Sequence, residues 1–418
     1  MSFTWNSAQN LIGGMAFGFE KEFGNPQQII TGFAVNDKLY IDYKNNQHKE
    51  NIPVVTMSPD YKEIKEGPEL EKVDIYAMTP ICSGLSMLNS SKTGDKARGD
   101  ADNCQNQNMY NLTELAMTQE AKVIAFENAP TLYTDSGKGV CQKLDEIAKR
   151  YGYSMQLVKT NTILHGVGQN RPRTFSMFYR DTNPPKFEFE KLPYKPFWEY
   201  CDEVKNSEYS GVFVRNLSKD KYYEFILNDT NTKDLKSAIA VLISRGLKPR
   251  NVGTTQQLAR ACGPEKCLEY LKSQLNGDKD HDDIYQRHIR WMEHSILKNG
   301  AIFDSSSIFM HTDYINALIS KNIGYIIPSH GDVQERFMDY AEMLHMMAMP
   351  TDYHIEDLKH NWLKVTQNVP VCTANYIARQ IKKYLNGELE LATTRFVKQN
   401  NTTQHNDLAI FSTPLTDW

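Results

Sequence analysis

The chain has 418 residues, of which 40% are hydrophobic and 23% are charged, and its formal net charge is −4. This length allows two domains, or one large domain with an insertion, and the composition is that of an ordinary globular protein. The slightly acidic balance excludes a strongly basic nucleic-acid coat protein but is compatible with a basic cleft on an acidic surface.

Targeting signals and cysteine usage both indicate a cytoplasmic protein. No apolar run approaches the roughly 20 residues needed to cross a bilayer. The residues from Met1 to Asn6 show no basic region followed by an apolar core, so we expect no signal peptide. Seven scattered cysteines are typical of reduced thiols. Cys262 and Cys267 have no second Cys or His pair at ligand spacing, so we predict no metal site.

The first part of the chain alternates strand-like and helix-like stretches, which is typical of a parallel sheet flanked by helices. Residues 112–121 and 141–151 space their apolar side chains at helical intervals. The sequence therefore predicts an α/β fold with helices on both faces and function at the carboxyl ends of the strands. The predicted strands are 29–35, 73–78, 123–126 and 173–179.

The segment Asp-Thr-Asn-Pro-Pro at 181–185 interrupts this pattern and predicts a domain boundary. We therefore divide the chain into a first domain at 1–185, an inserted domain at 186–335, and closing segments at 336–418 that return to the first domain. The inserted part has mixed periodicity and includes an amphipathic helix at 235–244. The closing part is helical and ends in a polar tail.

A thiol and a carboxyl group follow two neighbouring predicted strands. Cys82 lies just beyond residues 73–78, between Pro80 and Gly84. A lone cysteine is more often a small buried hydrophobe, but this strand–loop setting favours a nucleophile. Glu127 directly follows residues 123–126. In an enclosed pocket such a carboxyl has a raised pKa and can act as an acid, whereas an isolated one would simply face solvent.

Two arginines precede the last predicted strand in the segment Gln169-Asn170-Arg171-Pro172-Arg173. Because side chains alternate between the two sides of an extended segment, we expect the guanidinium groups of Arg171 and Arg173 on the same side. There, one can hold an oxygen of a base while the other holds phosphate or the glutamate. Thiol, carboxyl and guanidiniums together are the groups needed to attack a pyrimidine ring and neutralise the charge that develops on it.

Near the start, the segment from Gly13 to Glu20 is glycine-rich, which lets backbone approach a ligand closely. Asp37, after the next predicted strand, suits a ribose-binding acid, although a turn aspartate is an equally good interpretation of that residue alone. Near the end, the segment 365–371 contains Asn368 and Val369.

Together these motifs resemble the DNA (cytosine-5) methyltransferase family of bacterial or phage type, with a divergent S-adenosylmethionine motif. The resemblance covers both ends of the chain, including 336–353 and 365–371, and leaves 186–335 as the target-recognition domain. It implies a Rossmann-like methyltransferase fold and the cofactor S-adenosylmethionine, without a metal. The implied catalytic residues are the nucleophile Cys82, the ring-nitrogen partner Glu127, Arg171 and the base-contacting Arg173. The implied cofactor-binding residues are Ile12, Gly13, Gly14, Asp37, Pro80, Asn368 and Val369.

The chain departs from the family pattern at two loops. The family motif Phe-x-Gly-x-Gly aligns with Gln9 to Gly13, so the aromatic residue and the first glycine are missing. At the nucleophile, Ile81 replaces the proline next to the cysteine, and Ser83 replaces a glutamine that can fill the hole left by an extruded base. Glu-Asn-Ala replaces Glu-Asn-Val at 127–129.

The implied partner is double-stranded DNA with a flipped target base, and we expect a monomer without an obligate protein partner. Basic residues of the inserted part could contact phosphates and base edges, although solvated surface is the other interpretation of each group. The predicted DNA-binding residues are Ser83, Ser86, Gln169, Arg245, Lys248, Arg250, Arg287 and Arg290. Two alternatives stay open: a homologue that binds DNA without methylating it or uses another donor for a different carbon-5 modification, and an RNA cytosine-5 methyltransferase.

Overall fold

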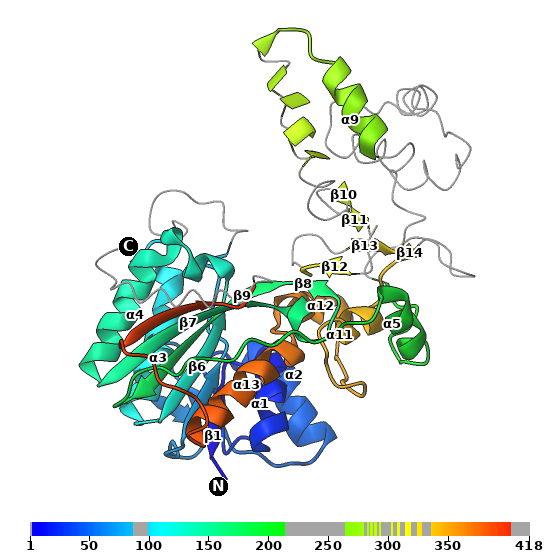
Figure 1. The fold of residues 1–418 in the computed structure, drawn as a ribbon. Helices are drawn as coiled ribbons and strands as arrows, with labels where there is room; N and C mark the ends of the chain where they lie inside the picture. The colour runs from blue at the N-terminus through cyan, green and yellow to red at the C-terminus, as the bar shows by residue number, and fades with distance from the viewer. Residues whose placement is uncertain are drawn as a thin grey trace. The chain divides into compact units, whose positions relative to one another are not determined.

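The computed structural model describes residues 2–86, 99–213 and 336–402, together with shorter stretches between 264 and 327 (Figure 1). The chain divides into two compact units. Met1–Tyr194 and Leu344–Trp418 form the first unit, and Lys195–Met343 form the second. The first unit therefore draws its residues from both ends of the sequence.

A nine-stranded sheet with the order β15-β7-β9-β6-β5-β1-β2-β3-β4 forms the centre of the first unit. β9 and β4 run antiparallel to their neighbours, and the remaining pairs are parallel. The predicted α/β class is confirmed. The strands are β1 (Trp5–Ala8), β2 (Ile29–Thr31), β3 (Val54–Met57), β4 (Ile64–Glu66), β5 (Ile75–Met78), β6 (Val123–Asn128), β7 (Tyr153–Asn161), β9 (Pro172–Arg180) and β15 (Phe396–Asn400).

The central strands β1, β5 and β6 are buried at every residue. A parallel sheet covered on both faces excludes water from all of its central side chains, so its strands carry near-continuous apolar runs. In β6 this run is Val123-Ile124-Ala125-Phe126, followed by the polar Glu127 and Asn128. In β6 the polar groups therefore stand where the strand ends.

Helices cover the sheet, and α1 packs along α13 while α3 packs against α4. Most of each helix predicted at 112–121 and 141–151 is confirmed, because α3 covers the first as far as Thr118 and α4 covers the second as far as Arg150, and both begin earlier than expected. The helices and short helical turns of the first unit are α1 (Gly14–Phe23), α2 (Ala34–Ile41), η1 (Asp42–Gln47), η2 (Cys104–Asn106), α3 (Gln107–Thr118), η3 (Pro130–Tyr133), η4 (Asp135–Gly137), α4 (Lys138–Arg150), η5 (Thr162–Leu164), α12 (Leu358–Gln367) and α13 (Val371–Leu385).

Two predicted strand ends are wrong. The strand expected at 29–35 stops at Thr31, and α2 begins at Ala34, so Asp37 lies inside a helix and not just past a strand. Glu127 lies within β6, because β9 continues to pair with it, placing Phe175 opposite Glu127.

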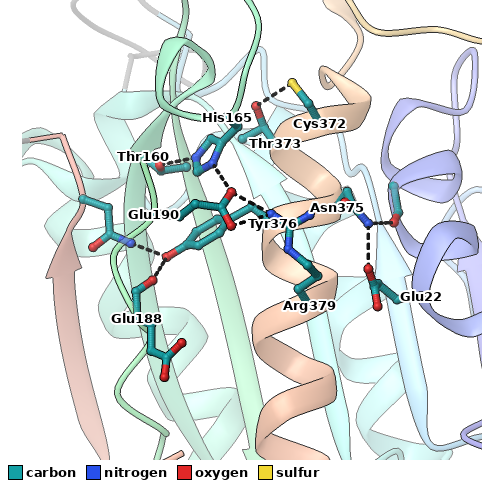
Figure 2. A network of polar contacts seen from close by, with 12 residues as sticks. Glu22, Thr160, His165, Glu188, Glu190, Cys372, Thr373, Asn375, Tyr376 and Arg379 are labelled. Atoms are coloured by element: carbon teal, nitrogen blue, oxygen red, sulfur yellow. Dashed lines mark hydrogen bonds and ion pairs between the residues drawn. The ribbon is translucent and has the colours of Figure 1, made fainter. Parts of the chain in front are cut away.

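A polar network holds α13 against the turn that follows β7 (Figure 2). The buried imidazole of His165 lies 2.7 Å from Thr160 Oγ1 and stacks on Tyr376, with 4.4 Å between ring centroids. Glu190 faces His165 Nδ1 and accepts two 2.6 Å bonds from Arg379 Nη2. Burial lowers the pKa of His165, so the ring is neutral near pH 7. The network fixes the turn that leads into the arginine motif.

The second unit contains a four-stranded sheet with the order β10-β11-β13-β14. The helix predicted at 235–244 lies outside the described residues. Nowhere in the described part of the chain is a helix long and apolar enough to span a membrane. The remaining elements are β8 (Gln169–Asn170), α5 (Phe197–Val204), α9 (Pro264–Ser273), β10 (Ile302–Phe303), β11 (Ser307–Phe309), β12 (Ile315–Asn316), β13 (Gly324–Ile327), β14 (Arg336–Phe337) and α11 (Tyr340–His345).

The contact between α1 and α13 depends on Gly18. A Cβ atom at Gly18 would lie 2.4 Å from Ala374 Cβ and 2.6 Å from the Asn375 nitrogen. Gly18→Ala is expected to lower stability by about 1–3 kcal/mol through overpacking, measured by chemical denaturation. Gly139→Ala in α4 is the matched control, because its Cβ would meet Ala101 at an ordinary 3.4 Å and helix propensity favours alanine by about 1 kcal/mol. Equal stability of the two variants would contradict the tight contact.

Candidate active site

The carboxyl ends of β1, β2, β5 and β6 lie next to one another at one edge of the sheet. β1 pairs in parallel with both β2 and β5, and β5 pairs in parallel with β6. The loops that leave β1 and β5 carry the glycine-rich segment and Cys82, and Glu127 is the second-last residue of β6. Neighbouring parallel strands lie roughly 5 Å apart, so the sheet brings these segments together.

Cys82 lies in a turn that begins four residues after β5. The Leu85 nitrogen donates to the Cys82 carbonyl, and the Ile81 nitrogen donates to Asn108 Oδ1 in α3. Pro80 is buried, while Cys82, Ser83 and Ser86 are partly buried. The structure thus holds the backbone on both sides of the thiol and leaves its side chain partly accessible.

Glu127 and Arg173 form a short, buried ion pair. Arg173 Nε lies 2.6 Å from Glu127 Oε1, and the glutamate side chain is 5% exposed. Burial raises the pKa of Glu127, and the Arg173 and Arg171 guanidiniums oppose that rise without cancelling it. A carboxyl with a raised pKa in an enclosed site can exchange a proton with a bound ligand near neutral pH.

The thiol belongs to the same electrostatic cluster. Burial raises the pKa of Cys82, the Glu127 carboxylate raises it further, and the Arg173 and Arg171 guanidiniums lower it. The four predicted catalytic residues are therefore close enough to influence one another's protonation. The net direction is upward, so the thiol is mainly protonated at neutral pH and must lose its proton before it can attack.

Arg171 and Arg173 make different contacts. Arg171 lies in the break between β8 and β9, is fully buried, and donates from Nη2 to the carbonyls of Thr366 and Asn368 at 2.9 and 2.8 Å. The expected extended alternation is interrupted at this break. Arg171 thus joins the arginine motif to the segment before α13, while Arg173 meets Glu127.

Asn368 links this segment to the glycine-rich loop. Its Oδ1 accepts a 2.9 Å bond from the Gly14 nitrogen, and its Nδ2 donates to Met349 Sδ. A Cβ atom at Gly14 would lie only 1.9 Å from the Val369 carbonyl oxygen. The two ends of the predicted cofactor site are therefore in direct contact, and only glycine fits at position 14.

The loop between β1 and α1 has three residues with left-handed backbone conformation. Gly13 has φ of 95°, while Gln9 and Leu11 have φ of 51° and 53°. Leu11 stands where the motif of the resembled family has glycine. The loop thus keeps a glycine-like backbone with a leucine side chain, at a cost of about 1–2 kcal/mol.

Asp37 is 1% exposed and accepts a 2.8 Å bond at Oδ1 from the Leu11 nitrogen. Burial raises the pKa of Asp37 to about 6, against the opposing effect of hydrogen bonds from Thr31 and from the Leu11 and Asn10 nitrogens. The carboxyl group of Asp37 therefore holds the strained loop in place through its bond with the Leu11 nitrogen. This position explains why a left-handed leucine is held there.

Several buried polar atoms at this edge have no hydrogen-bond partner among the described residues. They are Gln9 Oε1, Asn10 Nδ2, Asp37 Oδ2 and Thr79 Oγ1. A buried polar group without a partner costs about 1–3 kcal/mol, and a polar ligand can supply the missing bonds. Most of these atoms are hydrogen-bond acceptors, so they fit a ligand with amine and hydroxyl groups. The buried Ile12 and Val369 lie beside them.

The sequence did not single out Asn10 or Thr79. Both follow the ends of strands, β1 and β5 respectively. For Thr79 the signal was present, because it is the first polar residue after an apolar run. For Asn10 the signal was hidden, because β1 is short and half polar.

The predicted DNA-binding residues are scattered. Gln169 is fully buried, and its Nε2 donates to the Met346 carbonyl at 2.6 Å, so no part of it faces solvent. Arg290, in the second unit, is exposed. Ser83 and Ser86 lie in the cysteine loop. Outside the described residues lie Arg245, Lys248, Arg250 and Arg287.

A family profile described as C-5 cytosine-specific DNA methylase matches residues 10–383. Among curated proteins, the type II methyltransferase M.NgoPII of Neisseria gonorrhoeae is 25% identical over 179 residues, which are 43% of this chain and 48% of that protein. The chain therefore matches about half the length of this relative.

One solved methyltransferase structure supports the fold, and a second is similar to this chain at a lower score. The Entamoeba histolytica methyltransferase EhMeth superposes with a TM-score of 0.51 at 13% identity, covering 93% of this chain and 99% of that one. The Dnmt2 methyltransferase of S. pombe gives a TM-score of 0.49 at 9% identity, covering 92% and 99%. The predicted Rossmann-like methyltransferase fold is confirmed.

The buried carboxyl of Asp37 predicts a pH-dependent stability. Its pKa in the folded chain, about 6, lies above the ordinary value of 3.8, so the folded state holds a proton that the unfolded state releases. Stability relative to Asp37→Asn should therefore fall by about 3 kcal/mol as pH rises from about 3 to about 7. Denaturation of both proteins across this range measures the difference.

The matching change at the exposed Asp181 controls for the loss of one negative charge. If the difference in stability between wild type and Asp37→Asn stays constant from low to neutral pH, the raised pKa of Asp37 is contradicted.

Proposed function

This chain belongs to the C-5 cytosine-specific DNA methylase family, and from that premise we propose that it transfers a methyl group from S-adenosylmethionine to carbon 5 of cytosine in double-stranded DNA. The observation that carries the proposal is the electrostatic cluster of Cys82, Glu127 and Arg173 at the carboxyl edge of the sheet. A nucleophile, an acid and a fixed cation occupy one partly enclosed site.

In the proposed mechanism, Cys82 loses its proton and its sulfur forms a bond to carbon 6 of the cytosine. Electrons shift toward carbon 5 and ring nitrogen 3, where Glu127 donates a hydrogen bond or a proton. Arg173 holds both the glutamate and oxygen 2 of the base. When carbon 5 has taken the methyl group and lost its own proton, the bond to sulfur breaks and the thiolate leaves.

S-Adenosylmethionine supplies the methyl group when it is bound. The residues proposed to hold it are those of the loop between β1 and α1, Ile12, Gly13 and Gly14, with Asp37, Pro80, Asn368 and Val369. Two observations support this fit: the unpartnered buried polar atoms at the edge of the sheet, and the direct bond from Gly14 to Asn368. Arg171 is a positioning residue, because its guanidinium holds the carbonyl of Asn368.

The family favours a DNA substrate, and we assign the recognition of its sequence to the second unit. A carbon-5 target inside a stacked duplex must be flipped out to reach Cys82. Competition between matched DNA and RNA substrates separates this proposal from methylation of RNA.

A second candidate function rests on the loop residue Leu11. The backbone of Leu11 has a left-handed conformation, at a position that the family fills with glycine. The leucine side chain takes up space that glycine would leave to the methyl donor, which favours another donor. Modified nucleosides of a mass other than 5-methyldeoxycytidine would support it. Micromolar binding of S-adenosylmethionine in calorimetry would count against it.

Cys82→Ala should abolish methyl transfer, because alanine has no thiol to form the bond to carbon 6. The measurement is nucleoside mass spectrometry on DNA from cells that express each protein, where 5-methyldeoxycytidine should disappear in the variant. Cys104→Ala, which removes an exposed free thiol, should leave the product unchanged. Full methylation by Cys82→Ala would contradict the assignment of Cys82 as the nucleophile.

Glu127→Gln should lower kcat by roughly 10²–10⁴-fold, the usual contribution of a positioned acid, while the KM for S-adenosylmethionine stays near its original value. Steady-state kinetics with labelled methyl donor measures both parameters. Glu114→Gln is the control, because Glu114 pairs with Arg150 away from the site. An unchanged kcat for Glu127→Gln would remove Glu127 from the mechanism.

A further inference from the structure

Two lysines on neighbouring strands share one tyrosine ring. Lys398 of β15 lies with Nζ 4.5 Å from the ring centroid of Tyr133, and Lys159 of β7 lies 5.9 Å from the same centroid. Lys398 Nζ also donates a 2.7 Å bond to the Tyr133 carbonyl. All three side chains are partly exposed, so the group forms a basic and aromatic surface, which we call the Lys159–Tyr133–Lys398 surface.

This surface lies close to the proposed active site. In the register of the sheet, Asn128 of β6 pairs with Thr174, Thr174 pairs with Lys159, and Lys159 pairs with Asn400. The backbone of Lys159 is therefore two strands, or roughly 10 Å, from that of Asn128, and its side chain lies on the face of the sheet opposite to that of Glu127. Tyr133 ends η3, the turn that follows β6 directly.

The end of the cysteine loop reaches the same neighbourhood. The Gly99 nitrogen donates to the Gly84 carbonyl, and Gly99 packs tightly on the carbonyl of Ser136, three residues after Tyr133. The surface thus lies at the rim of the site, beside the segment that carries the nucleophile.

The two ammonium groups are held close to each other although like charges repel. Burial and, to a smaller extent, the charge of Lys159 lower the pKa of Lys398 to about 8, while Cys141 and Asp135 oppose this effect. Asp135 is exposed, so its carboxylate is well solvated. A bound anion would stabilise both ammonium groups and offset their repulsion.

We infer that the Lys159–Tyr133–Lys398 surface binds the phosphate backbone of the DNA strand beside the flipped cytosine. One strand of duplex DNA carries a phosphate for about every 3.4 Å of axis, so a contact some 10 Å away reaches a phosphate about three nucleotides from the target. Tyrosine between two lysines can also stack on a sugar or on an exposed base.

This inference rests on the proposed DNA substrate and extends it, because none of the predicted DNA-binding residues lies on this surface. Phosphate contacts carry no sequence information. They position the duplex and make its binding dependent on salt. The second unit would then read the sequence, while the first unit holds the backbone.

The test compares three full-length proteins: wild type, Lys159→Gln/Lys398→Gln, and the control Lys72→Gln/Lys122→Gln. The control lysines form exposed ion pairs just before β5 and β6, at the opposite edge of the sheet. Fluorescence anisotropy with a labelled duplex, from about 50 to 200 mM salt, gives the affinity and its salt slope.

For Lys159→Gln/Lys398→Gln, the negative slope of log K against log salt should become smaller in magnitude by about 2, since each lost phosphate contact removes about 0.9. At 0.1 M salt this corresponds to binding that is roughly 10- to 60-fold weaker. The KM for S-adenosylmethionine and kcat at saturating DNA should stay unchanged. The control should keep the wild-type slope.

A slope equal to that of wild type, or an equal decrease in the control, would overturn the inference while leaving methylation intact. Failure of the proposed function would appear differently, as a wild-type protein that neither binds duplex DNA nor methylates it. If circular dichroism shows that the double variant is unfolded, Lys159→Gln alone carries the test, with an expected slope decrease of about 0.9.

Discussion

The site depends on the hydrogen bonds that the buried guanidinium group of Arg171 donates. A charge taken fully out of water must have its donors satisfied, and Arg171 donates to the carbonyls of Thr366 and Asn368, nearly 200 residues later in the chain. Asn368 in turn receives the Gly14 nitrogen. One side chain thus connects the arginine motif, the segment before α13 and the glycine-rich loop.

The site itself is an arrangement of opposing electrostatic effects. Burial favours neutral forms of Cys82 and Glu127, while Arg173 and Arg171 favour their charged forms. Because burial dominates, the pKa of each group is raised above its ordinary value. A thiol that is mainly protonated is protected from oxidation and becomes reactive only when a substrate changes the local field.

The loop between β1 and α1 shows how a departure from a sequence pattern can leave the backbone unchanged. Leu11 replaces a glycine but keeps a positive φ, because its nitrogen is bonded to the buried carboxyl of Asp37. The strain at Leu11 is a cost of this arrangement, and the burial of Asp37, which raises its pKa against the effect of the Leu11 bond, is another. Such costs persist at functional sites, where the surrounding structure compensates for them.

The sequence by itself determined the α/β class, the family and the residues that gather at the strand ends, because apolar runs mark buried parallel strands and polar residues mark where those strands stop. It did not determine that Asp37 belongs to a helix, that Gln169 is buried, or that the two arginines have separate partners. Those outcomes depend on contacts between segments far apart in the chain, such as Gln169 with Met346. The placement of Lys159 and Lys398 around the ring of Tyr133 is of the same kind, since it depends on the parallel register of β7 and β15. Local pattern fixes elements, and tertiary packing decides which side chains meet.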